Sequence, residues 1–275
     1  MTDAPAPGPG DFDEDEVDRE RLPRGLTLRA LAPNAVTSAA LCAGLTGIRF
    51  GIMGDWERAV MAVILAGVLD GIDGRVARLM KAESRFGAEL DSLSDAISFG
   101  VAPALILFLW SLQGLPRLGW LAALAFAVAC ALRLARFNAR IDLKDQPHKS
   151  AGFLTGVPAP LGAGLAFLPL YLWIASGNDL FREPWLVAAW AVAIAFLMIS
   201  NMATLSWSSM RPRKTIRLEV LALAGLVIAA LLTEPWMTLV GICAVYLALM
   251  PLGVIRYARV RRQRAAAAGS QSASG

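Results

Sequence analysis

Long apolar runs, each close to the length of a membrane-spanning helix, recur along the sequence from Ala32 to Ile255. A spanning helix needs about 20 consecutive apolar residues. The chain is 56% hydrophobic and only 17% charged over 275 residues, whereas a soluble domain of this size carries more charge. We therefore expect an all-α, polytopic membrane helical bundle with no separate soluble domain.

Eight of these runs have the length and composition of transmembrane helices. Six or seven spans remain possible if one run is re-entrant. Pro33 suits the start of the first helix, and the stretch from Gly100 to Pro103 should bend or break the third. The eight runs cover residues 33–52, 58–80, 88–112, 118–139, 158–177, 185–205, 217–233 and 236–256.

The distribution of basic residues predicts the orientation. If both termini lie in the cytoplasm, the inside segments contain all but four of the 26 Lys and Arg residues. The exceptions are Arg49, Arg58, Arg117 and Arg182. Loops rich in Lys and Arg stay on the cytoplasmic side. We therefore expect a multi-pass protein of the cell (inner, cytoplasmic) membrane.

The two ends of the chain differ in composition from the rest. Residues 1–29 combine many acidic side chains with Pro and Gly and cannot bury enough apolar surface to fold, so we expect a disordered acidic tail and a juxtamembrane segment. Residues 261–275 are rich in Ala, Gly and Ser and predict a second disordered tail. Residues 30–260 then form the membrane domain.

Histidine and cysteine chemistry is disfavoured. His148 is the only histidine, which argues against a histidine-built metal site or a Ser-His-Asp triad. The three cysteines, Cys42, Cys130 and Cys243, lie in apolar runs without close spacing and are typical of buried hydrophobic residues.

One acidic segment, DGIDGRVARLMKAESRFGAELDSLSD at residues 70–95, interrupts the apolar pattern. Asp70 and Asp73 share one face of the second helix, and Asp91 and Asp95 share one face of the third. A short turn makes these helices antiparallel neighbours, so the two pairs should meet at their cytoplasmic ends. Ionisable residues at membrane depth are functional candidates.

Four carboxylates so close together would repel one another unless a cation neutralised them. Oxygen ligands favour magnesium, manganese or calcium and fit zinc poorly. Gly74, Ala77 and Gly87 leave room for helix approach or for a ligand, and Arg78 could bind a phosphate. A metal, an arginine and a spare carboxylate are the components of phosphoryl transfer.

Two other interpretations remain open for the acidic segment. It could be a structural charge network that closes two helix ends. It could also belong to an ion-coupled transporter, in which intramembrane acids relay cations. The second half of the chain, however, shows no corresponding acids at membrane depth.

The pattern D-x2-D-G-x2-A-R-x8-G-x3-D-x3-D resembles the signature of the CDP-alcohol phosphotransferase family. The resemblance implies transfer of a phosphatidyl or related group from a CDP-linked lipid to an alcohol, with release of CMP. It also implies a membrane homodimer that uses one or two divalent cations, magnesium or manganese. By this resemblance Asp70, Asp73, Asp91 and Asp95 bind metal, and Asp95 is also the catalytic general base. The residues implied in binding the CDP-lipid are Asp70, Gly74, Ala77, Arg78 and Gly87.

The segments outside the motif bear on the acceptor alcohol. They resemble the integral-membrane phosphatidylserine synthase branch of the family, which implies that the partners are CDP-diacylglycerol, serine and membrane lipids, and not nucleic acid. Glycerol 3-phosphate or an inositol compound is the alternative acceptor. The matching segments are APN at 32–34, FGAELDSLSDAISFGVAPA at 86–104, LRLARFN at 132–138 and GFLTGVPAP at 152–160.

Several polar residues after the fourth span could bind the acceptor. A zwitterionic amino acid needs a cation for its carboxylate and an acceptor for its ammonium group. Arg133 and Arg136 could hold the acceptor's carboxylate or a substrate phosphate. Asn138 ends the same span, and Lys149 follows in the adjoining loop. Glycerol phosphate would also need cations here, so these residues do not identify the acceptor.

Overall fold

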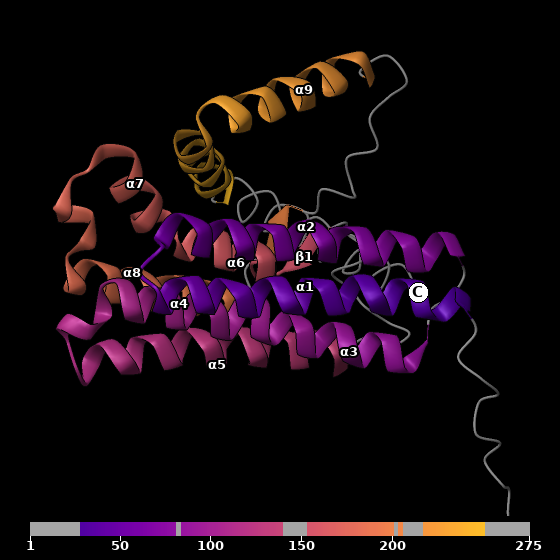
Figure 1. Ribbon diagram of the computed structural model, residues 1–275, viewed down its shortest axis with the longest axis horizontal. Coiled ribbons are helices and arrows are strands. Elements are labelled where there is room, and N and C mark those ends of the chain that lie inside the picture. Colours follow the sequence, from indigo (N-terminus) through magenta and orange to yellow (C-terminus); the bar gives the residue numbers. More distant parts are fainter. Residues whose placement is uncertain (1–27, 81–83, 140–152, 201–202, 206–216, 251–275) are drawn as a thin grey trace, which may run out of the picture.

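A computed structural model of the chain describes residues 28–80, 84–139, 153–200, 203–205 and 217–250. Most of the expected N-terminal tail and all of the C-terminal one lie outside these residues. The described part is a bundle of helices lying side by side, with α9 standing apart from the rest (Figure 1). This confirms the expected helical class.

The helices follow the apolar runs of the sequence. Two three-residue strands, β1 (Phe153–Thr155) and β2 (Ala203–Leu205), pair antiparallel and are the exception to the helical class among the described residues. An unlabelled last helix covers Pro235–Met250. The other elements are α1 (Leu28–Ile52), α2 (Trp56–Met80), α3 (Arg85–Asp95), the π-helical η1 (Ala96–Val101), α4 (Ala102–Trp110), the 3-10 turn η2 (Leu112–Gly114), α5 (Leu118–Ala139), α6 (Ala159–Ala166), α7 (Leu168–Ser176), the 3-10 turn η4 (Asp179–Arg182), α8 (Pro184–Ile199) and α9 (Arg217–Thr233).

All eight expected runs contain helix, but they differ in length. The sixth run was predicted to extend to residue 205, and this is wrong because α8 ends at Ile199 and β2 follows. Shorter apolar helices cover Pro184–Ile199, Leu218–Thr233 and Pro235–Met250. Among the described residues, the helices long and apolar enough to cross a membrane are Ala32–Ile52, Arg85–Trp110, Leu118–Ala139 and Ala159–Ser176.

Two prolines alter helices without ending the span. Near Pro103, where we expected a bend or break, the chain adopts the π-helix η1 and continues as α4. Pro169 lacks the N–H that would bond to the carbonyl of Leu165, and the helix is interrupted at Phe167 between α6 and α7. The Leu165 carbonyl instead accepts a hydrogen bond from Trp190 Nε1 of α8 at 2.8 Å.

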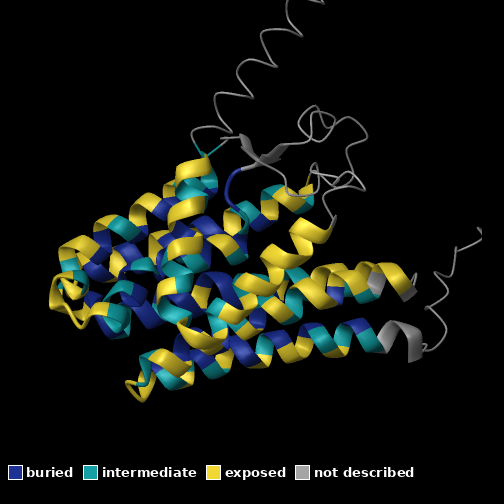
Figure 2. Cartoon of the chain, turned by 90° about the horizontal axis from the view of Figure 1, so that it is seen from above, coloured by how far each residue is buried: buried dark blue, intermediate teal, exposed yellow. Residues whose placement is uncertain are grey.

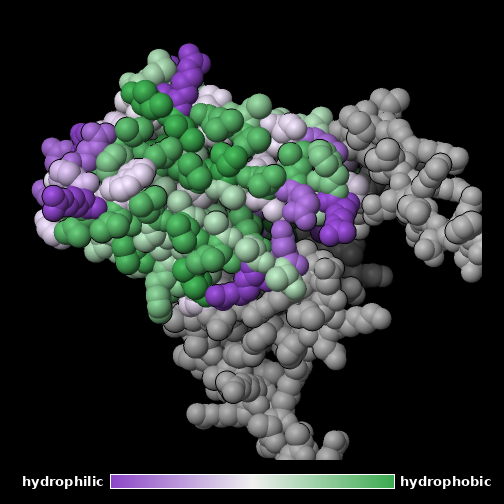
Figure 3. All heavy atoms as spheres, turned by 90° about the horizontal axis from the view of Figure 1, so that it is seen from below, coloured by the Kyte–Doolittle hydropathy of each residue, from purple (hydrophilic) through white to green (hydrophobic). Residues whose placement is uncertain are grey.

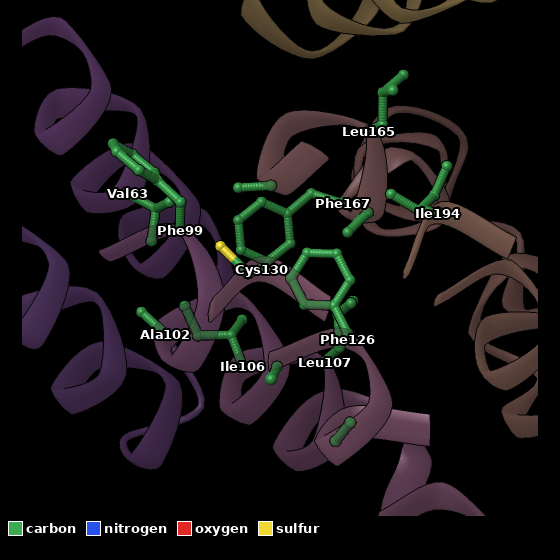
Figure 4. Close-up of a cluster of buried hydrophobic side chains, with 14 of the residues drawn as sticks. Val63, Phe99, Ala102, Ile106, Leu107, Phe126, Cys130, Leu165, Phe167 and Ile194 are labelled. Atoms are coloured by element: carbon green, nitrogen blue, oxygen red, sulfur yellow. The ribbon is translucent and has the colours of Figure 1, made fainter. Parts of the chain in front are cut away.

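The core lies between α2, the α3–η1–α4 segment, α5 and α6–α8. The largest contacts between helices are those of α1 with α2 and of α5 with α8. Phe99, Phe126 and Phe167 are fully buried in this core. They pack among apolar side chains from α2, α4, α5, α6 and α8 (Figure 4). This core fixes η1, and therefore the end of α3 that carries Asp95.

The outer surface is also apolar. Exposed residues cover the outward faces of the helices (Figure 2), and many of them are large hydrophobic residues such as Leu121, Phe196 and Leu232. The face in Figure 3 is mostly hydrophobic, with hydrophilic residues toward its margins. A helix bundle that is apolar inside and outside is typical of a protein whose solvent is lipid.

Candidate active site

Three of the four aspartates, one on α2 and two on α3, bring their carboxylates together. Asp70, Asp91 and Asp95 each offer a carboxylate oxygen, and these oxygens lie within 4.8 Å of one another. All three residues are half-buried. Ser84 caps the N-terminus of α3 by accepting a hydrogen bond from the Gly87 N–H at 3.0 Å, which starts the helix just after the turn.

Asp73 is placed differently from the other three aspartates. It is buried, with 4% exposure, and its Oδ2 accepts a hydrogen bond from Thr37 Oγ1 of α1 at 2.7 Å. It is not among the three carboxylates that gather within 4.8 Å. The structure therefore divides the motif into a cluster of three acids and one acid held by α1.

Among the residues that the structure describes, the acids of this cluster form no ion pair with a basic side chain. Within the described ranges, no Lys or Arg nitrogen lies within 4.0 Å of Asp70, Asp91 or Asp95. Arg133 of α5 is a cation whose charge acts on Asp95, and its Nε is buried without a hydrogen-bond partner among the described residues. Acidic side chains packed this closely need a compensating charge.

This donor set fits a hard divalent cation. All three potential ligands are carboxylate oxygens, one from α2 and two from α3. Magnesium, manganese and calcium prefer oxygen ligands of this kind. The arrangement therefore has the chemistry of a site for a hard divalent cation.

The small residues of the motif have two different surroundings. A Cβ at Gly74 would meet no atom within 4 Å, so space is open beside α2. A Cβ at Gly87 would lie 3.0 Å from Asn34 Oδ1, so Gly87 permits close approach of α1 and α3. Arg78 is exposed on α2, and the Ala77 side chain lies outside the described residues.

The four expected acceptor-binding residues differ in their surroundings. Arg133 is the one near Asp95. Arg136 Nη1 donates a hydrogen bond to the carbonyl of Ile199 at 2.7 Å, which ties α5 to the end of α8. Asn138 Nδ2 donates to Ser92 Oγ at 2.8 Å, beside Asp91. Lys149 lies outside the described residues.

Sequence reasoning missed a set of hydroxyl residues between α1 and the motif. Besides Thr37, Ser94 Oγ donates to the Thr37 carbonyl at 3.3 Å, and Ser98 Oγ donates to the Ala40 carbonyl at 3.4 Å. The signal that could have found them is the four-residue spacing of Ser94 and Ser98, which puts both hydroxyls on one face of the helical segment.

Comparisons with known proteins identify a family for the region that contains these residues. A family model described as CDP-alcohol phosphatidyltransferase matches residues 30–201, and one described as CDP-alcohol phosphatidyltransferase 2 matches residues 215–251. The first match contains all of the motif and the three clustered acids. The second covers α9 and the helix that follows it.

Curated relatives carry one shared name. The chain is 36% identical over 236 residues to the CDP-diacylglycerol--serine O-phosphatidyltransferase of Mycobacterium leprae, covering 86% of this chain and 78% of that protein. Proteins of the same name from Helicobacter pylori and Bacillus subtilis are 35% and 31% identical. These matches cover 62% of this chain, with 70% of the first protein and 87% of the second.

Proposed function

Because the chain belongs to the CDP-alcohol phosphatidyltransferase family, we propose that it transfers the phosphatidyl group of CDP-diacylglycerol to the hydroxyl of L-serine. The products are phosphatidylserine and CMP. The observation that carries this proposal is the convergence of Asp70, Asp91 and Asp95 in a chain whose relatives carry the name of that reaction.

In this proposal the aspartates hold one or two divalent cations, magnesium or manganese. Asp70, Asp91 and Asp95 supply the clustered oxygens, and Asp73 contributes from its place beside Thr37. When bound, the cation supplies positive charge that neutralises phosphate oxygens.

Asp95 is the proposed general base. Its carboxylate takes the proton of the serine hydroxyl while the serine oxygen forms a bond to the phosphorus attached to diacylglycerol. The bond from that phosphorus to the bridging oxygen breaks, and CMP leaves with the bonding electrons. Asp95 suits this role because it lies at the junction of α3 and η1, where Phe99 anchors the backbone in the core.

The remaining motif residues would form the CDP-lipid pocket. Asp70 and the open space beside Gly74 face the ligand, Ala77 and Gly87 keep the pocket free of bulk, and Arg78 binds a phosphate. Arg133 is the strongest candidate for the acceptor's carboxylate, because its buried Nε has no partner among the described residues. Asn138 and Lys149 would complete the acceptor site, and Arg136 would support it through α8.

The protein is a multi-pass membrane protein, and the proposal places it in the inner membrane as a homodimer. Residues 30–260 form the membrane domain with eight spans, and residues 1–29 and 261–275 form tails in the cytoplasm. The catalytic ends of α2 and α3 then face the cytoplasm, where serine and the released CMP are soluble, while the lipid chains remain in the bilayer.

An acceptor panel tests the proposal. Purified protein with CDP-diacylglycerol and magnesium or manganese is offered serine, glycerol 3-phosphate or inositol, and CMP release is measured. We expect release with serine alone, and its loss after exhaustive chelation of divalent cations. Release with another acceptor would reassign the substrate. No release with any acceptor, together with cation-driven uptake in vesicles, would support a transporter.

A further inference from the structure

Thr37 of α1 contacts both helices that carry the acidic motif. Its side chain reaches α2, where Oγ1 lies 2.7 Å from Asp73 Oδ2. Its backbone carbonyl reaches α3, where it accepts a hydrogen bond from Ser94 Oγ at 3.3 Å. Ser94 lies directly before Asp95 in the sequence. A single residue therefore connects the two halves of the motif.

The Thr37 hydroxyl has one proton and two possible acceptors. Besides Asp73 Oδ2, the carbonyl of Pro33 lies 3.1 Å from Oγ1. A hydroxyl donates only one hydrogen bond at a time. The shorter distance and the acceptor strength of a carboxylate favour Asp73, so Thr37 gives up the usual bond to the preceding turn of its own helix.

Burial makes this connection costly to lose. Thr37, Asp73 and Ser94 are only 5%, 4% and 3% exposed, so water does not replace a missing partner. The helices also approach closely nearby, because a Cβ at Gly44 of α1 would lie 2.9 Å from the Cα of Ser98. The contact is therefore a packed, hydrogen-bonded seam and not a surface bond.

We propose that Thr37 is a positioning residue that sets the register of α2 against α3, so that Asp70 meets Asp91 and Asp95 in one cation site. The inference rests on the proposed function only in taking that cluster as the metal site. Asp70 lies one helical turn before Asp73 on α2, and a shift of Asp73 along or around the helix therefore moves Asp70 out of the cluster. Substituting a residue that holds a metal ligand in place typically weakens metal binding by about 10–100-fold.

The test measures manganese binding directly in the full-length protein. Free Mn²⁺ is followed by electron paramagnetic resonance as purified protein is titrated, without any substrate. We expect Thr37→Val to weaken Mn²⁺ binding at least about tenfold, and Thr37→Ser, which keeps the hydroxyl, to restore most of it. Ser94→Ala should weaken binding less, because it removes one longer bond and leaves the Thr37 side chain in place.

Thr46→Val is the matched control. Thr46 lies on the same helix and donates from Oγ1 to the Cys42 carbonyl at 2.6 Å, and among the described residues it has no hydrogen bond to an acid. It should bind Mn²⁺ as the unmodified protein does. Elution of each variant as a single species with unchanged helical circular dichroism establishes that it is folded.

The outcomes separate this inference from the proposed function. Equal Mn²⁺ binding by the unmodified protein and a folded Thr37→Val would overturn the positioning role, as would failure of a folded Thr37→Ser to recover binding. If Thr37→Val misfolds, the Mn²⁺ affinities of Thr37→Ser and Ser94→Ala are compared instead. Weaker binding by Ser94→Ala than by Thr37→Ser would support the positioning role, and equal binding would contradict it. Mn²⁺ binding that depends on Thr37, without phosphatidyl transfer to any acceptor, would contradict the proposed reaction and support the positioning role.

Discussion

Charged residues occur at both ends of the bundle, but their surroundings differ. At the end formed by the α1–α2 turn and η4, which we term the far end, Asp55 pairs with Arg58 at 3.2 Å and Asp179 accepts a hydrogen bond from Trp173 Nε1 at 3.0 Å. At the motif end, Asp70, Asp91 and Asp95 face one another with no basic nitrogen within 4.0 Å among the described residues.

The difference indicates which charges serve the fold and which serve a ligand. Asp55 and Asp179 bind partners from neighbouring turns, so these two carboxylates are satisfied within the protein. The motif acids repel one another when they are ionised, and a bound cation would make their proximity favourable. Substitutions at the two ends should therefore affect different properties.

The largest contrast should come from neutralising one acid at each end. Asp95→Asn removes the proposed base and should lower phosphatidyl transfer by about 10²–10⁴-fold, while leaving CDP-lipid binding largely intact. Asp55→Asn, its far-end counterpart, should leave transfer unchanged. CMP release under saturating substrate measures both, and full activity of Asp95→Asn would exclude the general-base role.

The helix contact behind the motif should be more sensitive than a helix exposed to lipid. Gly44→Ala places a methyl group against the backbone of Ser98, and such overpacking costs about 1–3 kcal/mol of unfolding free energy. Gly225→Ala on α9 is the control, because a Cβ there meets nothing within 4 Å. Thermal or denaturant unfolding in detergent distinguishes them, and an unchanged midpoint for Gly44→Ala would argue against the close contact of α1 with η1.

Residue spacing predicted most of the helices and the meeting of Asp70 with Asp91 and Asp95. Apolar run lengths located α1, α2 and α5 closely, because a lipid environment requires uninterrupted helix. Spacing did not separate Asp73 from the other acids, since helical periodicity places Asp70 and Asp73 on neighbouring positions of one face. Asp73 is instead hydrogen-bonded by Thr37, which lies 36 residues away in the sequence.

The other differences also arise from contacts between distant segments. The interruption at Phe167 is stabilised by Trp190, 25 residues beyond the carbonyl that it binds. Arg133 and Arg136 looked equivalent in sequence, but only a folded structure places Arg136 against the end of α8. Local patterns predict elements, whereas polar contacts between distant helices decide which side chains remain available to a ligand.

A smaller effect at the motif end should come from filling the space beside Gly74. Because a Cβ at Gly74 touches no protein atom, Gly74→Ala should fold normally. It should nevertheless raise the KM for CDP-diacylglycerol about tenfold, a free energy of about 1.4 kcal/mol, if the nucleotide uses that space. Gly71→Ala, also on α2 and also without neighbours within 4 Å, is the control, and equal KM values for the two variants would place the ligand elsewhere.

The smallest effect should come from Arg182 at the far end. Its Nε donates to the Trp110 carbonyl at 3.1 Å, and its guanidinium lies 5.5 Å from the centre of the Trp173 ring. Because Arg182 is exposed, Arg182→Ala should cost only about 1 kcal/mol of unfolding free energy and leave phosphatidyl transfer unchanged. Arg117→Ala removes an equally exposed arginine that has no such contacts among the described residues, so a matching loss in both variants would show that the Trp110 and Trp173 contacts contribute nothing. A fall in transfer with Arg182→Ala would instead show that the far end communicates with the acids, and that the two ends do not act separately.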